Sequence, residues 1–265
     1  MRNLVIAFSV IIFMFACSNT NHYLAKMEGL EIDSIVADST LYLTNDSNSP
    51  KAEIKINMQY LRGKNANIIN QQLIQSGILS SELFLQHDGS KKIKSSVDTF
   101  IKNYFQEYRD YNGPLFREDK QNGSFYNCFF RLSTKAQISD KQVLTYILKI
   151  TKTEDGKHES NQKQVIHFNT TSGKIITLKD IFIEGSETSI LDAIIAKLMK
   201  EFKTKDLTEL RSKGIFGDIQ PYIPDNYIFH NGNITFIFEE DQIAPHHFGE
   251  INVELKHDEI EKYLK

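Results

Sequence analysis

Hydrophobic and polar residues alternate from position 51 to 60, which is the pattern of a strand that buries one face. A shorter strand is predicted just before it, at 35–43. A polar start at Asn65 leads into a helix-like stretch. A stronger helix is predicted at 97–108, where apolar residues recur with the spacing i, i+3, i+4 and i+7. Because an Asn-Gly-Pro sequence occupies 112–114, we predict that this helix ends before it.

Three strand candidates follow in succession, at 124–138, 142–153 and 159–169. The second of them is rich in β-branched and aromatic residues. An Asp-Gly pair at 155–156 indicates a hairpin between the second and the third. A tight turn then leads into a further short strand at 175–178. Consecutive strands joined by short turns favour an antiparallel sheet.

An amphipathic helix is predicted at 190–202, where apolar residues form a wide stripe. Ile194 and Leu198 lie at the centre of this stripe, and we expect both side chains to be fully buried. Thr188 or Ser189 is the predicted cap at its start.

The last part of the chain alternates between helix and strand signals. A short helix is predicted within 203–213, and an Asn-Gly turn indicates a hairpin over 227–239. A strand at 251–255 precedes a terminal helix that Asp258 is predicted to cap. The order of elements predicts an α+β fold, with mainly antiparallel sheets flanked by helices, rather than a doubly wound parallel sheet.

Composition narrows the possible function classes. The chain has 265 residues, of which 40% are hydrophobic, so it can bury a substantial core. Lys and Arg number 31 against 34 for Asp and Glu. This balance argues against a nucleic-acid-binding protein, which normally carries a basic excess or stripe. Two cysteines exclude a disulfide scaffold and a cysteine-rich metal module.

The first seventeen residues have the features of a bacterial export signal. Arg2 precedes an apolar run at 4–15, which is too short to cross a bilayer but has the length of a secretory signal core. The run ends in Met14-Phe15-Ala16-Cys17, which resembles a lipobox, the motif whose cysteine is lipidated. We therefore expect a lipoprotein of the bacterial cell envelope, attached to the outer membrane through Cys17. The alternatives are an ordinary signal peptide and a buried helix with an incidental cysteine.

Cys128 is the thiol that remains after such processing. On a strand it shares a face with Tyr126, Phe130 and Leu132. We interpret it as a small buried core residue, because nothing local supplies the base that a catalytic thiol needs.

Two segments near the C-terminus resemble the RsiV-like extracytoplasmic domain family of bacterial envelope proteins. The first, 165–182, is similar to the family's strand, its T-x-G-K turn and its L-x-D-L/I-F run. The second, 223–249, ends in a loop similar to the family's Y-E-I-A-P-Y-A-x-G sequence. Asp241-Gln242 stands here in place of Tyr-Glu, and His246-His247 in place of Tyr-Ala.

Residues 50–155 are similar in element order to the N-terminal domain that precedes this domain in PdaC- and RsiV-type proteins. The resemblance implies two intimately packed subdomains, at 50–155 and 156–265. They follow the signal peptide at 1–17 and a predicted tether at 18–49, where Ser, Thr, Asn and Asp are common and periodicity is weak. The resemblance also implies no catalysis of its own, since the chemistry of PdaC-type proteins belongs to a separate deacetylase domain. We expect a binding module without a cofactor, for a protein such as a lysozyme-like muramidase or for a cell-wall glycan.

The loop at 241–249 is the candidate contact surface, because Pro245 stiffens it and Phe248 offers an apolar anchor. The candidate binding residues are Asp241, Gln242, Ile243, Pro245, His246, His247 and Phe248. His230, Glu239 and Glu240 add further ionisable groups nearby in the sequence. A zinc site is disfavoured, because adjacent histidines point apart on a strand and no HExxH spacing occurs.

Two other functions remain open. A peptidoglycan-directed hydrolase would need two carboxyl groups about 5–10 Å apart, and Glu239 with Asp180 is a formal pair. We interpret Asp180 instead as a residue that caps the turn into the following segment. The third alternative is a structural envelope protein without a small ligand. A pocket with converging carboxylates would favour the enzyme, and a shallow groove or an exposed apolar patch would favour the binder.

Overall fold

The computed structural model describes residues 30–79, 92–140, 142–153 and 155–265. The predicted signal peptide and its lipidation site Cys17 lie outside the described residues. So does the first part of the predicted tether.

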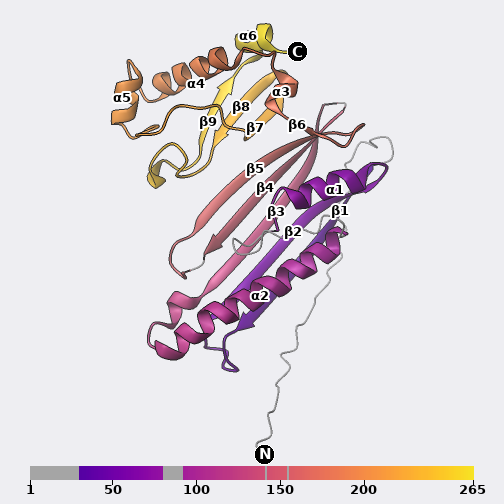
Figure 1. Ribbon diagram of the computed structural model, residues 1–265, viewed down its shortest axis with the longest axis vertical. Helices are drawn as coiled ribbons and strands as arrows, with labels where there is room; N and C mark the ends of the chain where they lie inside the picture. Colours follow the sequence, from indigo (N-terminus) through magenta and orange to yellow (C-terminus); the bar gives the residue numbers. More distant parts are fainter. Residues whose placement is uncertain (1–29, 80–91, 141, 154) are drawn as a thin grey trace, which may run out of the picture.

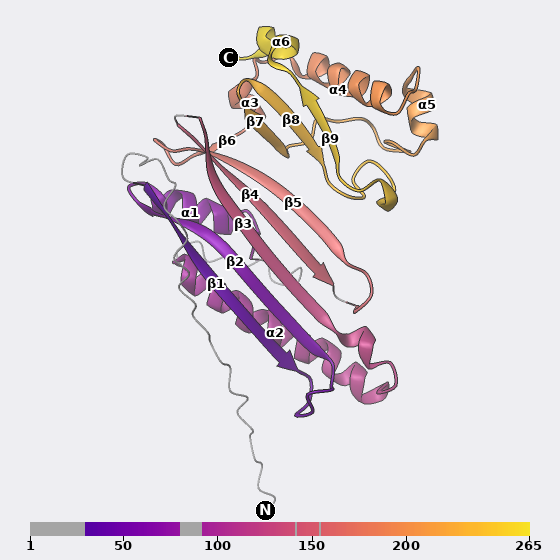
Figure 2. The ribbon, with the colours of Figure 1, turned by 180° about the vertical axis from the view of Figure 1, so that it is seen from behind.

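A six-stranded sheet forms the larger part of the molecule (Figure 1). Its strands lie in sequence order: β1 (Leu30–Tyr42), β2 (Lys51–Gly63), β3 (Cys128–Asp140), β4 (Val143–Thr153), β5 (Ser160–Asn169) and β6 (Ile175–Ile176). Neighbours pair antiparallel except β2 and β3, which run parallel. The chain makes this parallel crossover through α1 (Ala66–Gln75) and α2 (Ile93–Glu118). These two helices cover one face of β1, β2 and β3, as the front and back views show (Figures 1 and 2).

The first hydrophobic core lies between this sheet face and the two helices. Alternate residues of β2 are buried in it, namely Ala52, Ile54, Ile56 and Met58, which confirms the predicted alternation. From the helices, Ile69, Leu73, Val97 and Phe100 close the core. Cys128 is 8% exposed and belongs to the same cluster, as predicted.

The helix predicted to end before 112–114 continues to Glu118, so that prediction is wrong. Pro114 lies inside α2, where its missing N–H removes one helical hydrogen bond. Contacts on both sides of Pro114 hold the helix together. The Tyr108 hydroxyl donates to the backbone C=O of Tyr126 at 2.9 Å, and the Phe116 ring packs edge-on against the Tyr126 ring.

The boundaries of two predicted domains also change. The tether expected at 18–49 is wrong for residues 30–42, because β1 pairs with β2 along its whole length. The division expected between 155 and 156 falls inside the first sheet, since β5 pairs with β4 over ten residues and Phe168 belongs to the first core. A second core begins at Phe182, so the two parts meet close to Thr177.

The C-terminal part contains a three-stranded antiparallel sheet of β7 (Tyr227–His230), β8 (Asn233–Phe238) and β9 (Ile251–Leu255). The helix α4 (Glu187–Glu201) packs against β9 and contributes Ile190, Ile194 and Leu198 to the second core. Ile194 and Leu198 are both 0% exposed, as predicted. The shorter elements are α3 (Leu178–Ile181), α5 (Leu207–Ser212), α6 (His257–Ile260) and the 3-10 turns η1 (Gly123–Tyr126), η2 (His246–Phe248) and η3 (Glu261–Tyr263).

The N-cap positions of α4 and α6 lie two or three residues before the predicted caps. Ser186 is the N-cap position of α4, so Thr188 and Ser189 lie inside its first turn. Lys256 is the N-cap position of α6, so Asp258 is a first-turn residue and not the cap. Asp180 is confirmed as an ordering residue, because its carboxylate accepts the backbone N–H of Thr177 at 2.8 Å in a capping box.

The two parts of the molecule join along β5. His167 is 2% exposed, and its ring stacks on the ring of Tyr227 with centroids 4.7 Å apart. Its Nε2 lies 2.9 Å from the Tyr227 backbone oxygen, and its Nδ1 lies 2.8 Å from the hydroxyl oxygen of Thr145. The Tyr227 hydroxyl in turn donates to the C=O of Ile176 at 2.9 Å. This buried polar junction fixes the second sheet against the first.

Candidate functional site

The loop predicted as a contact surface turns its apolar side chains inward. Ile243 is 3% exposed and belongs to the second core, and its C=O accepts the N–H of Phe216. Phe248 is half-buried, with its ring packed edge-on against Phe202. Ile243 is therefore not available to a ligand and Phe248 is only partly so, contrary to the prediction. Local sequence patterns do not reveal these contacts, because Ile243 and Phe248 pack against segments distant along the chain.

The polar members of this loop remain on the surface. His246 Nδ1 lies 3.1 Å from an Asp241 carboxylate oxygen and 3.4 Å from a Glu240 one. The hydrogen bond to Asp241, with the negative charges of both carboxylates, raises the pKa of His246. The His247 ring packs against Phe248. Within the described residues, no three His, Cys, Asp or Glu side chains are grouped to hold a metal ion.

A cavity of about 430 Å³ opens between the first sheet and the loops of the second part. Its floor is formed by residues of β4 and β5, and its opposite wall by the segment before β7 and the turn after β8. The lining residues are Leu148, Ile150, Gln162, Gln164, Val165, Tyr222, Pro224, Asp225, Asn226, Glu239 and Gln242. Of the predicted loop residues, Gln242 thus reaches this cavity. We call it the amide cavity, after its Gln and Asn side chains.

A second cavity of about 330 Å³ adjoins the amide cavity and shares Ile150, Gln162 and Glu239 with it. Its other lining residues are Lys149, Thr151, Asn161, Lys163, Glu240 and Glu250. We call it the acidic cavity. The Lys163 ammonium group lies 2.8 Å from a Glu250 carboxylate oxygen, which neutralises one of its three acids.

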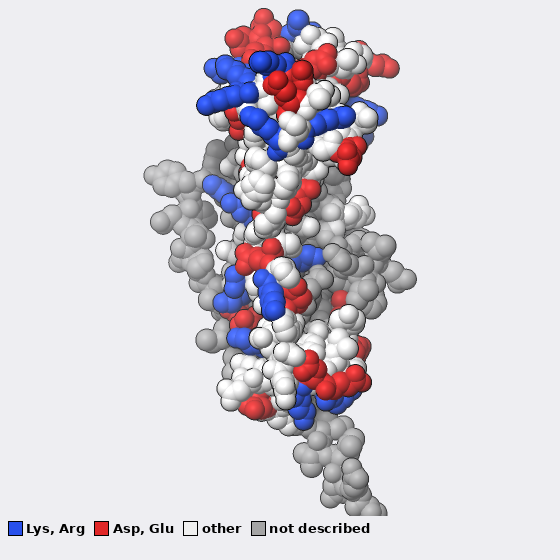
Figure 3. All heavy atoms as spheres, turned by 90° about the vertical axis from the view of Figure 1, so that its left-hand side faces the viewer, with Lys and Arg blue, Asp and Glu red and all other residues white. Residues whose placement is uncertain are grey.

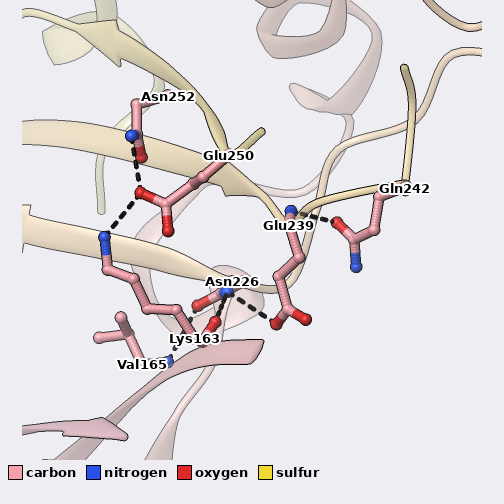
Figure 4. A network of polar contacts seen from close by, with 7 residues as sticks. All are labelled: Lys163, Val165, Asn226, Glu239, Gln242, Glu250 and Asn252. Carbon is pink, nitrogen blue, oxygen red and sulfur yellow. Dashed lines mark hydrogen bonds and ion pairs between the residues drawn. The ribbon is translucent and has the colours of Figure 1, made fainter. Parts of the chain in front are cut away.

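Glu239 lies where the two cavities meet. Its side chain accepts a hydrogen bond from the Asn226 amide at 3.3 Å, and its backbone N–H donates to the Gln242 side chain at 2.9 Å (Figure 4). Partial burial, with a smaller contribution from the negative charge of Glu250, raises the pKa of Glu239. Burial, followed by the charge of Glu239, likewise raises the pKa of the Tyr222 hydroxyl. The Glu239 carboxyl group thus lies at the junction of both cavities, half-buried and hydrogen-bonded to Asn226.

Asn226, in the wall of the amide cavity, forms hydrogen bonds to the backbone at the edge of β5. Its side-chain oxygen accepts the N–H of Val165 at 2.9 Å, and its side-chain nitrogen donates to the C=O of Lys163 (Figure 4). One amide side chain therefore reproduces the pair of bonds that a neighbouring strand would make. Its own backbone C=O accepts the N–H of Ile237 at 2.8 Å, which anchors it to β8.

Sequence reasoning missed the residues of the amide cavity, although one signal was present. In β5, Gln162 and Gln164 lie on the same face as Ile166 and Phe168, which are buried. Polar residues at positions where the alternation calls for apolar ones indicate that this end of the strand face is not covered by the core. Tyr222 and Asn226 carry no comparable signal, because they lie in a loop whose position depends on the fold.

Residues 179–258 match the family model DUF3298, described as a protein of unknown function. The matched segment begins beside Thr177, where the second part of the molecule starts. No curated protein matches the chain.

Two solved structures of DUF3298 family members have a similar fold. One, from Bacteroides fragilis NCTC 9343, is 22% identical with a TM-score of 0.79, covering 91% of this chain and 96% of its own. The other, from Pseudomonas aeruginosa PAO1, is 12% identical with a TM-score of 0.59, covering 90% of this chain and 96% of its own. These likenesses show that these two proteins share the α+β fold of both parts of this chain, and not only of the matched segment.

Surface charge and helix length add two observations. On the face in Figure 3, Lys and Arg side chains are interspersed with Asp and Glu along the molecule, without a continuous basic stripe. Across the described part of the chain, no helix combines the length and the hydropathy needed to span a bilayer.

Proposed function

We propose that the protein is a non-catalytic binding module that holds a glycan in the amide cavity. The observation that carries this proposal is the combination of planar polar side chains with an exposed aromatic ring in one groove. The amide side chains that line the cavity are those of Gln162, Gln164, Asn226 and Gln242. The aromatic ring is that of Tyr222, which is 37% exposed.

Sugars suit this chemistry. A sugar ring has hydroxyl groups that both donate and accept hydrogen bonds, and an apolar face of C–H groups that stacks on an aromatic ring. The amides of Gln162 and Gln164 each supply a donor and an acceptor, the Gln242 amide nitrogen supplies a donor, and the Glu239 carboxylate supplies further acceptors. The apolar floor of Leu148, Ile150 and Val165 adds contact area. The resemblance to RsiV-like and PdaC-like envelope proteins supports a cell-wall glycan as the natural ligand.

The raised pKa of Glu239 favours one competing function, a glycoside hydrolase in which this residue acts as the general acid. Such an enzyme would need Asp225, the other carboxylate that lines the amide cavity, as the partner of Glu239, because Glu250 is held by Lys163 and by the Asn252 amide. We favour binding, because the Glu239 carboxylate already accepts a hydrogen bond from the Asn226 amide.

Titration with N-acetylglucosamine oligosaccharides tests the proposed function. We expect saturable binding by the wild-type protein and a loss of affinity of about tenfold or more in Tyr222→Ala, which removes the stacking surface. Tyr111→Ala is the matched control, because Tyr111 is 69% exposed on α2, away from the cavity residues. The oligosaccharides should be recovered at full length. Absence of binding would refute the proposal, and shortened products would establish the hydrolase.

We propose further that Cys17 anchors the protein to the envelope membrane, with the folded part presented to the periplasm or the cell surface. Cys17→Ser should abolish acyl labelling and release the protein from the membrane fraction. Cys128→Ala is the control and should keep both properties, because Cys128 is buried in the first core. Labelling and membrane retention that survive in Cys17→Ser would contradict the anchor.

A further inference from the structure

The edge of β5 is only partly paired. β6 pairs with β5 only at His167 and Phe168. Beside them, the Asn226 side chain donates a hydrogen bond to the C=O of Lys163 and accepts one from the N–H of Val165. These contacts show that odd-numbered residues of β5 direct their backbone groups away from β4. By the two-residue period of a strand, the N–H and C=O of Asn161 and the N–H of Lys163 point the same way.

These three backbone groups have no hydrogen-bond partner among the described residues. Asn161 is also exposed to solvent. A strand edge with free N–H and C=O groups is a template on which another extended chain can pair. The side chains at this edge are polar or charged, but two cavities adjoin it and leave space beside the backbone.

The two cavities take most of their β4 and β5 residues from opposite faces of the sheet at this edge, although Ile150 and Gln162 line both. Gln162 and Gln164 share a face of the sheet with Leu148 and Ile150 in the amide cavity. Asn161 and Lys163 share the other face with Lys149 and Thr151 in the acidic cavity. Side chains of a strand added to this edge would therefore alternate between the two cavities.

We propose that the free edge of β5 at 160–163 binds an extended peptide segment by strand addition. In this mode the main-chain hydrogen bonds supply affinity, and pockets for alternate side chains supply specificity. The free stretch ends at Lys163, because Asn226 already occupies the next bonding positions. The part of the peptide that pairs with β5 is therefore short, and its central residue lies opposite Asn161.

The charge of the acidic cavity indicates what the peptide carries. Its charged lining residues are three acids and two lysines, namely Glu239, Glu240, Glu250, Lys149 and Lys163. Lys163 forms an ion pair with Glu250. A Lys or Arg side chain pointing into this cavity would meet Glu239 and Glu240, with Lys149 also in the lining and His246 Nδ1 3.4 Å from the Glu240 carboxylate. This site goes beyond the proposed glycan site, although the two share Glu239.

Selection from a library of random seven-residue peptides against the folded chain tests the inference. We expect enriched peptides with a basic residue, and binding that falls at least about tenfold in Asn161→Pro, which removes the outward N–H. Proline is tolerated at edge positions whose N–H faces solvent, so the fold should persist. Asn161→Ala removes the same side chain but keeps the N–H, and it should bind at least about tenfold more tightly than Asn161→Pro.

A second arm does not depend on a protein variant. Methylation of the peptide nitrogens that face β5 should abolish binding, whereas methylation of the alternate nitrogens should not. The inference is overturned if no peptide is enriched, if Asn161→Pro and Asn161→Ala bind equally, or if neither set of methylations matters. Oligosaccharide binding measured on Asn161→Pro separates the two proposals, because it should remain at the wild-type level.

Discussion

Replacing Leu198 by alanine should lower the free energy of unfolding by about 2–5 kcal/mol, the usual cost of truncating a fully buried leucine. Leu198 is 0% exposed and packs in the second core, between α4 and the sheet of β7, β8 and β9. The truncation removes apolar contacts and leaves a cavity that the neighbouring Ile194 cannot fill without moving. Denaturant unfolding followed by circular dichroism measures the change.

Lys200→Ala provides the matched control, because Lys200 is an exposed residue of the same helix. Its effect should stay within about 0.5 kcal/mol, as for most surface substitutions. A loss below about 0.5 kcal/mol in Leu198→Ala would contradict the burial of the α4 stripe. An equal loss in both variants would show that the helix, and not the core, limits stability.

Local patterns were sufficient to predict most elements of the fold. The two-residue alternation of β2 and the apolar stripe of α4 each depend on residues close in sequence, and both are confirmed. The Asn-Gly turn at 231–232 likewise joins β7 and β8 as predicted. Boundaries failed where distant contacts decide them. Proline at position 114 reads as a helix stop, yet the packing of Phe116 on Tyr126 keeps α2 intact beyond it.

The candidate site was harder to predict for the same physical reason. The amide cavity combines β4 and β5 with the segment before β7, and no local pattern shows that these segments meet. The loop at 241–249 was selected for its stiffness and its aromatic residue. In the structure Ile243 instead lies in the second core, and Asp241, Gln242, His246 and His247 form the exposed surface of the loop. Only Gln242 connects the predicted surface with the cavity.

Protonation of His167 should weaken the junction between the two parts of the molecule. The Tyr227 carbonyl can only accept a hydrogen bond, so Nε2 of the neutral ring donates to it and Nδ1 accepts from the Thr145 hydroxyl. Burial lowers the pKa of His167, and the bond to Tyr227 offsets this only in part. The charged ring would have to direct an N–H at the Thr145 oxygen, and the Thr145 hydroxyl would have to turn away.

The sign of the pH dependence follows from this lowered pKa. The unfolded chain, with an ordinary histidine pKa of about 6.5, binds the proton at a higher pH than the folded chain does. The stability that His167 contributes is therefore complete above about pH 6.5 and is lost as the pH falls through the folded-state pKa. The slope for one such proton reaches about 1.4 kcal/mol per pH unit. His246, whose pKa is raised, contributes in the opposite direction, so it reduces the net slope of the wild type.

Unfolding free energies measured from pH 7.5 down to pH 5 in wild type and in His167→Gln isolate this contribution. We expect His167→Gln to be less stable than wild type at pH 7.5, because glutamine cannot reproduce both hydrogen bonds and the ring stacking. The difference should shrink as the pH falls, since only the wild type must exclude a proton from the junction. His230→Gln, which changes an exposed histidine of β7, should follow the wild-type curve. A difference between wild type and His167→Gln that is constant with pH would show that the junction tolerates the charged ring, and that its stability comes from packing alone.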